Sequence, residues 1–289
     1  MILTTHKSRL ILIFMAVAFF LAGCSSLDKA NALLREGKND EALAMAIGYL
    51  SDGDPQVRIQ AIKLVARIGG EKAGEALMPL LNDENADAKI EAIKAIGIVG
   101  YQPAAKQLIE MMIPAKGLLF ETIAGTISRL GTPAIDIIVS RMDLAATQAE
   151  KDQFRKFLVA IGPQVAEAVA KSMKGKSAFE NEEKFQILIA LKNPKTSYLL
   201  VQQIDDVEVG HLVEEGLVKL GSMSEKPVME ELQNRISDTQ NKAGKEALIK
   251  VLGDLKAKMA IPLLEQLSKD PSDLVRAAAD HALTKIRGF

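Results

Sequence analysis

A short phrase, an apolar residue followed by glycine, recurs along the chain at intervals of roughly 30 residues. Glycine adopts a left-handed backbone conformation at little cost, so the phrase is typical of the end of a helix. In the fifth slot a lysine replaces the glycine, at Leu191-Lys192. The phrase itself stands at Ile68-Gly69, Ile96-Gly97, Leu130-Gly131, Ile161-Gly162, Leu220-Gly221 and Leu252-Gly253. This recurrence predicts one structural unit repeated along most of the chain.

Each repeat is predicted to be a pair of helices. Before the first glycine, Asp54-Pro55 supplies a cap and a first-turn proline, and apolar positions then follow a helical period: Val57, Ala61, Leu64, Val65 and Ile68. A second amphipathic helix follows, and its apolar face consists of Ala73, Leu77, Leu80 and Leu81. The last full repeat has the corresponding apolar face at Ala260, Leu263, Leu264 and Leu267. A pair this small cannot bury its apolar stripe alone, so neighbouring pairs must stack.

Several motifs carry a family resemblance. The first repeat has Asp54-Pro55-Gln56-Val57-Arg58, and the last region has Asp270-Pro271 with Val275-Arg276 and Ala278. These motifs resemble HEAT repeats of the phycobilisome-lyase-like type. The resemblance implies an all-α fold, a right-handed α-solenoid of about seven to eight helix pairs over residues 52–289. The middle repeats depart from it, because Glu121 stands where Arg58 does and the stretch 174–195 has lost its glycine.

A further pair of short helices is expected before the repeats, broken at Gly37-Lys38-Asn39. Its residues Ala32, Leu33, Leu34, Glu41, Ala42 and Leu43 resemble a tetratricopeptide half-motif. We interpret residues 24–51 as the N-terminal helical cap of the stack, with an independent module as the alternative.

The N-terminal segment has the composition of an export signal. His6, Lys7 and Arg9 precede an apolar run over residues 10–21. The run is shorter than the roughly 20 apolar residues that cross a bilayer. Ser25, Ser26 and Asp28 follow without a basic stop-transfer cluster. This pattern predicts export followed by cleavage.

Leu21-Ala22-Gly23-Cys24 comes directly after the apolar run and resembles the lipobox of bacterial lipoprotein precursors at all four positions. The resemblance implies that residues 1–23 are a cleaved signal peptide, recognised through Leu21, Ala22 and Gly23. It also implies that Cys24 carries acyl chains such as palmitate, which anchor the protein to a membrane. Ser25 after the cysteine implies sorting to the outer membrane, facing the periplasm. The alternative is that Cys24 is an incidental thiol.

Composition narrows the range of partners. The chain has 36 basic and 37 acidic residues, and cleavage would remove Lys7 and Arg9, leaving a net charge of −3. No strong positive field would attract phosphate, and aromatic residues make up only 4% of the chain, so nucleic acid is not an expected partner. A single cysteine excludes an internal disulfide and a thiolate-rich zinc site.

Candidate catalytic chemistry is sparse. After residue 23 the chain has two histidines, His211 and His281, and neither has another histidine or cysteine at metal-ligand spacing. Adjacent carboxylates, Asp205-Asp206 and Glu230-Glu231, point about 100° apart on a helix and are expected to be solvated. The sequence predicts no enzyme, no cofactor and no metal site.

Aligning the repeats places one exposed residue of each second helix at an equivalent position. We call these residues the second-helix row: Glu75, Lys106, Asp136, Glu167, Tyr198, Glu230 and Lys258. Mixed charges fit recognition of protein surfaces better than capture of a polyanion. The sequence therefore predicts a membrane-tethered protein-interaction scaffold or adaptor of unidentified partner. The alternatives are a purely solvated face, an envelope maintenance factor that binds peptidoglycan or its enzymes, and an enzyme with a site between repeats.

Overall fold

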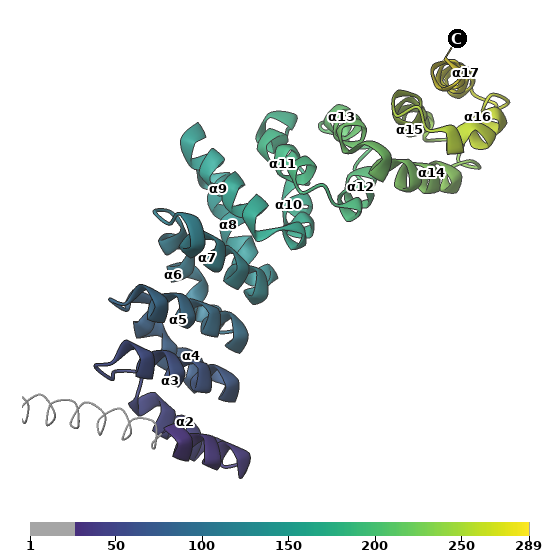
Figure 1. Ribbon diagram of the computed structural model, residues 1–289. Coiled ribbons are helices and arrows are strands. Elements are labelled where there is room, and N and C mark those ends of the chain that lie inside the picture. Colours follow the sequence, from purple (N-terminus) through teal and green to yellow (C-terminus); the bar gives the residue numbers. More distant parts are fainter. Residues whose placement is uncertain (1–26, 289) are drawn as a thin grey trace, which may run out of the picture. The chain divides into compact units, whose positions relative to one another are not determined.

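The computed structural model describes residues 27–288, and all their regular elements are helices (Figure 1). The chain divides into two compact units, of which unit 1 ends at Ala134 and unit 2 begins at Ile135. None of the helices within these residues is both long and apolar enough to cross a membrane. The predicted all-α fold built from repeated helix pairs is confirmed.

Unit 1 begins with a helix over residues 27–35. The helices that follow are α2 (Asn39–Gly48), α3 (Pro55–Ile68), α4 (Glu71–Leu77), α5 (Ala86–Val99), α6 (Ala105–Met112) and α7 (Gly117–Leu130). Short 3-10 turns extend two second helices: η1 (Met78–Asn82) continues α4, and η2 (Gln102–Ala104) leads into α6.

The first helices of unit 1 pack on one another along the stack. Helix α3 contacts α5, α5 contacts α7, and α2 packs against α3. The predicted inner positions Ala61, Leu64 and Val65 of α3 are buried, as are Ala73, Leu77, Leu80 and Leu81 of the second helix. Each pair thus buries its apolar stripe against its neighbours, which is the reason that the repeats stack.

Unit 2 repeats the same plan. After α8 (Thr132–Leu144), which contains the boundary between the units, its helices are α9 (Gln148–Ile161), α10 (Ala166–Met173), α11 (Ala178–Ala190), α12 (Pro194–Val201), α13 (Gly210–Leu220), α14 (Glu225–Asn234), α15 (Lys242–Asp254), α16 (Ile261–Leu267) and α17 (Asp273–Arg287). The 3-10 turns η3 (Pro163–Val165), η4 (Gly221–Ser224) and η5 (Lys258–Ala260) lead into α10, α14 and α16.

The first helices of unit 2, namely α9, α11, α13, α15 and α17, pack in chain order, and the second helices α10, α12 and α14 do the same. Side-chain caps fix several of their starting points. Thr147 and Glu150 form a reciprocal capping box at α9, and Ser177 and Glu180 form another at α11. In unit 1, Asp54 caps α3 by accepting a hydrogen bond from the Gln56 N–H at 2.8 Å.

The glycine phrases end helices at four of the six predicted positions. Gly69, Gly131, Gly162 and Gly221 directly follow α3, α7, α9 and α13, and all four have positive φ. In the slot without glycine, α11 ends at Ala190 and Lys192 takes a φ of 45°. The backbone geometry is therefore retained where the residue type is not.

Two glycine predictions are wrong. Gly97 lies inside α5, which ends before Gly100, and Gly253 lies inside α15. A Cβ atom on Gly253 would lie 3.0 Å from the Cα and Cβ atoms of Ala282 in α17, and one on Gly97 would lie 3.2 Å from Thr126 Cγ2 in α7. These two glycines let neighbouring first helices approach closely. An apolar residue followed by glycine can serve this purpose or end a helix, and the sequence phrase alone does not tell the two apart.

Candidate functional site

The second-helix row is exposed at every predicted position. All seven residues, Glu75, Lys106, Asp136, Glu167, Tyr198, Glu230 and Lys258, are exposed, and each lies on a second helix or on the 3-10 turn that begins one. In α10, Ala166 and Val169 are buried, whereas Glu167 between them is exposed. The helical period thus places the row residue on the face opposite the buried one. The structure confirms the exposure of the row; its role in binding stays a prediction.

Two row members in unit 2 contact each other directly. The Tyr198 hydroxyl donates a hydrogen bond to Glu230 Oε2 at 3.0 Å, which joins α12 to α14 across 32 residues of sequence. That hydrogen bond to the carboxylate raises the pKa of the Tyr198 phenol. Lys226 lies 3.6 Å from the other Glu230 oxygen, and Glu167 pairs with Lys195 at 2.5 Å. The row surface in unit 2 thus contains two polar contacts between neighbouring second helices, one of which includes an aromatic ring.

A groove adjoins this surface between α14 and α16. It has a volume of about 490 Å³ and begins at Glu230, the row member on α14. Its lining residues are Met229, Glu230, Gln233, Asn234, Met259, Pro262, Leu263 and Gln266. Met259 is 75% exposed, so the groove carries an unusually open apolar side chain. Sequence alignment of the repeats did not identify the groove, because it depends on the spacing of two second helices.

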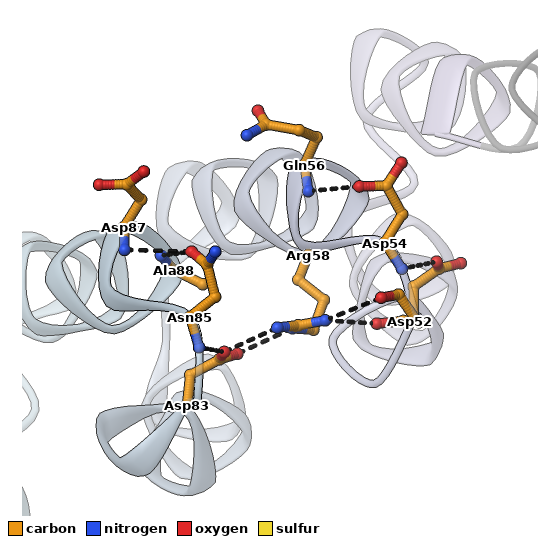
Figure 2. Close-up of polar contacts among 9 residues, drawn as sticks. Asp52, Asp54, Gln56, Arg58, Asp83, Asn85, Asp87 and Ala88 are labelled. Atoms are coloured by element: carbon orange, nitrogen blue, oxygen red, sulfur yellow. Dashed lines mark hydrogen bonds and ion pairs between the residues drawn. The ribbon is translucent and has the colours of Figure 1, made fainter.

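A second groove lies in unit 1 beside Arg58, with a volume of about 560 Å³ and apolar walls that include Ile47, Leu50 and Pro79. Figure 2 shows Arg58 between Asp83 and the loop at Asp52. Its guanidinium donates to both Asp83 carboxylate oxygens, at 2.7 and 2.8 Å, and to the Asp52 carbonyl oxygen at 2.8 Å. The Arg58 guanidinium is therefore occupied by contacts within unit 1.

The Arg58 bonds join one repeat to the next. Asp83, held by Arg58, also accepts a hydrogen bond from the Asn85 N–H at 2.8 Å, and Asn85 then caps α5 (Figure 2). The hydrogen bond from Arg58 holds the pKa of Asp83 below its usual range. In unit 2, Lys245 occupies the equivalent place and lies 3.1 Å from Asp270. Arg276 repeats the loop contact of Arg58, because its guanidinium donates to the Asp270 carbonyl oxygen at 2.6 Å as that of Arg58 does to the Asp52 carbonyl oxygen.

The adjacent carboxylates keep the access to solvent that the sequence predicted, with Asp205 and Glu230 exposed, but they also have partners within the chain. Asp205 and Glu231 converge on Arg235, with distances of 2.7 and 2.6 Å to its guanidinium nitrogens. Asp206 accepts a hydrogen bond from the Glu208 N–H, and Glu230 accepts the one from Tyr198. The prediction treated each acidic pair alone, whereas its members are satisfied separately by different parts of the repeat.

The two candidate histidines both lie exposed near helix surfaces, His211 at the start of α13 and His281 in α17. His211 borders a polar pocket of about 360 Å³ that also contacts Asp206, Glu246 and Lys250. Within residues 27–288, no group of three or more histidine, cysteine or acidic side chains is arranged to hold a metal ion. Leu21, Ala22, Gly23 and Cys24 lie outside the described residues.

Comparison with known proteins supports the repeat assignment. The sequence pattern of the HEAT repeat family matches residues 32–116, which include α2 to α6. The match begins inside the segment 24–51, whose assignment as a cap stays a prediction. No curated protein matches the chain.

Similar solved structures have low identity to this chain. Human deoxyhypusine hydroxylase in complex with glycerol is 15% identical, covering 89% of this chain and 99% of its own, with a TM-score of 0.36. The CpcE and CpcF complex of phycocyanin lyase from Nostoc sp. PCC7120 is 18% identical, covering 84% and 94%, with a TM-score of 0.34. Kap121p is 13% identical, with a TM-score of 0.38, and the match covers 92% of this chain but 35% of Kap121p. At these scores the likenesses do not bear on function. The helices and the match over residues 32–116 together show that this chain is an all-helical protein with HEAT repeats.

Proposed function

We propose that this chain is an exported, membrane-tethered scaffold or adaptor that binds other proteins through the exposed face of its second helices. The observation that carries the proposal is the exposure of all seven row residues on successive second helices. Stacked repeats present extended surfaces of this kind, on which neighbouring repeats each contribute a few contacts. The proposal includes no catalytic step.

The chemistry of the row supports a protein partner. Glu167 and Glu230 in unit 2 are acidic and Lys258 is basic, so a partner with complementary charges would be oriented by them. Tyr198 adds an aromatic ring with a polar end, the residue type that is enriched at the centres of protein interfaces. A solvated face without a partner would not require an aromatic ring at this position.

The tether is proposed from the sequence of residues 21–24. Cys24 would carry the lipid and hold the chain at the outer membrane, facing the periplasm. Each buried methylene contributes about 0.8 kcal/mol, so two or three acyl chains retain a protein without a transmembrane helix. The described helices begin three positions later, at residue 27, so the repeats would be held close to the bilayer surface.

The proposal is tested with a triple variant of unit 2, Glu167→Lys, Tyr198→Ala and Glu230→Lys. Parent and variant are crosslinked in membranes, and the amount of the partner recovered with each is compared. We expect the variant to lose most of the recovery, because an interfacial aromatic ring can contribute 2 kcal/mol or more and reversed charges slow association. Helical circular dichroism should be unchanged, since exposed ion pairs contribute little to folding.

The matched control reverses charges on the first helices of the same unit, with Lys156→Glu, Glu182→Lys and Asp280→Lys. All three residues are exposed. Undiminished recovery by the row variant would overturn the proposal, and so would an equal loss with the control variant.

A further inference from the structure

The second helices of unit 2 are unevenly spaced. Helix α12 packs closely on α14, and the Tyr198–Glu230 hydrogen bond joins them. Helix α14 does not pack closely on α16, although the first helices α15 and α17 beneath them are in close contact. The groove of about 490 Å³ fills this interval and is open to solvent along the second-helix face.

The apolar part of the groove is accessible. Leu263 forms a buried floor at 8% exposure, while Met259 is 75% exposed on one wall and Met229 is partly exposed on the other. Methionine side chains are flexible and polarisable, so they adapt to partners of different shape. The groove can therefore accept a medium-sized apolar side chain between the two thioethers.

The polar part of the groove consists of side-chain amides. Gln233, Asn234 and Gln266 are exposed, and for none of these three described residues does the structure record a side-chain hydrogen bond. An amide both donates and accepts, which matches the N–H and C=O groups of a polypeptide backbone. A helical ligand would already have satisfied its own backbone, whereas an extended segment leaves these groups to its binding site.

The charge of the groove also limits which ligands it can bind. Glu230 is the one charged residue among those that line the groove, all of which are described. Its carboxylate accepts from Tyr198 and lies 3.6 Å from the exposed Lys226, so it keeps hydrogen-bonding capacity for a ligand. A basic side chain complements this end of the groove, and an acidic one opposes it.

We infer that the groove between α14 and α16 binds an extended polypeptide segment of a partner protein, one that carries an apolar side chain beside a basic one. The apolar side chain enters between Met229 and Met259, the basic side chain reaches Glu230, and the backbone bonds to the amides. The inference rests on the proposed function, because it names the class of partner recognised on the same face.

The test uses the full chain, purified in detergent and immobilised, and a phage-displayed library of random nonapeptides. Enriched peptides are synthesised with a fluorophore, and their affinities are measured by fluorescence anisotropy. We expect the enriched sequences to place Leu, Ile, Met or Phe next to Lys or Arg. Met259→Asp and Gln266→Ala should each weaken binding about tenfold, the change that corresponds to 1.4 kcal/mol.

Val207→Asp is the matched control, because Val207 is 96% exposed in the same unit but does not line this groove. The control should bind the peptides as the parent does. Any of three results would overturn the inference. They are that no peptide is enriched, that the peptides bind Met259→Asp as tightly as the parent, or that the peptides bind as amphipathic helices. Glu230 belongs to both the row and the groove, whereas Met259 lies only in the groove, so Met259→Asp is also put through the partner-recovery assay. Parental recovery with Met259→Asp, together with loss of recovery in the row variant, would reject the groove and leave the proposed function standing.

Discussion

The buried ammonium of Lys184 lies 2.7 Å from Asp143 Oδ1, which links α11 to α8 inside unit 2. Lys176 holds the other oxygen of the same carboxylate at 2.5 Å, and Lys184 also donates to the Ser172 carbonyl oxygen at 3.1 Å. Burial lowers the pKa of Lys184, and the nearby Asp143 carboxylate opposes that shift. One carboxylate therefore neutralises a lysine that has no access to solvent, in the repeat that has lost its glycine.

Replacing Asp143 should destabilise unit 2 strongly. Asp143→Ala leaves Lys184 buried without a counter-charge, which typically costs about 3 to 5 kcal/mol. Adding Lys184→Met in the same chain removes the buried charge and keeps a similar volume, so the double variant should regain most of the loss. Urea unfolding followed by circular dichroism measures both. A single Asp143→Ala variant as stable as the parent would contradict the role of the pair.

The Lys184–Asp143 pair could not be predicted from the sequence, unlike the second-helix row. The repeat period places equivalent residues side by side, so the exposure of the second-helix row, and the neighbouring positions of Tyr198 and Glu230, follow from the alignment. Lys184 lies in the stretch where the alignment weakens. Its partners are Asp143 on α8 and the Ser172 carbonyl oxygen on α10, and the period of one helix does not predict contacts with two others.

Gly253 and Gly125, both inside helices, make a paired prediction with opposite signs. Gly253→Ala places a methyl group 3.0 Å from Ala282 in the neighbouring helix, and overpacking of this kind typically costs about 1 to 3 kcal/mol. Gly125 is exposed in α7 with no atom within 4 Å of its added Cβ, so Gly125→Ala should stabilise by about 0.5 to 1 kcal/mol. Thermal unfolding separates the two. Equal shifts in one direction would show that packing does not distinguish these positions.

Gly97 and Gly253 explain the error in the sequence analysis. An apolar residue followed by glycine has two physical uses in a stacked repeat, to end a helix or to admit a neighbouring helix. The sequence around Gly97 contains a second glycine, Gly100, which takes the left-handed conformation. After α15 the left-handed residue is Lys256, a residue type that rarely adopts this conformation. Tertiary packing decides between the two uses.

The Arg58–Asp83 pair should make the stability of unit 1 depend on acidity. Asp83 has a lowered pKa in the folded chain, so its contribution is fully present above the unfolded value of about 3.9 and is lost as pH falls through the folded value. Asp83→Asn should therefore be less stable than the parent at neutral pH, with the difference shrinking below about pH 4. The check is the urea midpoint of both proteins between neutral and acidic pH. A difference that stays constant would exclude the carboxylate as its source.

Truncation of a buried repeat leucine tests the stack itself. Leu64 is 4% exposed on α3, the helix that packs against α5. Leu64→Ala should cost about 2 to 5 kcal/mol, because a cavity remains where the side chain was. Lys63→Ala on the exposed side of the same helix is the control and should change the free energy of unfolding by less than about 0.5 kcal/mol. Equal unfolding midpoints for the two variants would argue against a packed helix pair at this position.

Lipid attachment is the prediction that depends on sequence alone. If Cys24 receives acyl chains, Cys24→Ser removes the sulfur to which they are joined, and the protein should no longer be labelled by a palmitate analogue. It should also leave the membrane fraction in high salt, because a chain with net charge −3 after cleavage lacks the basic patch that binds acidic lipids. Ser25→Ala, which keeps the cysteine, is the control and should be labelled like the parent. Labelling and sedimentation of the Cys24→Ser variant at parental levels would reject the anchor, and would leave the helix stack and its interaction surface to be judged by their own tests.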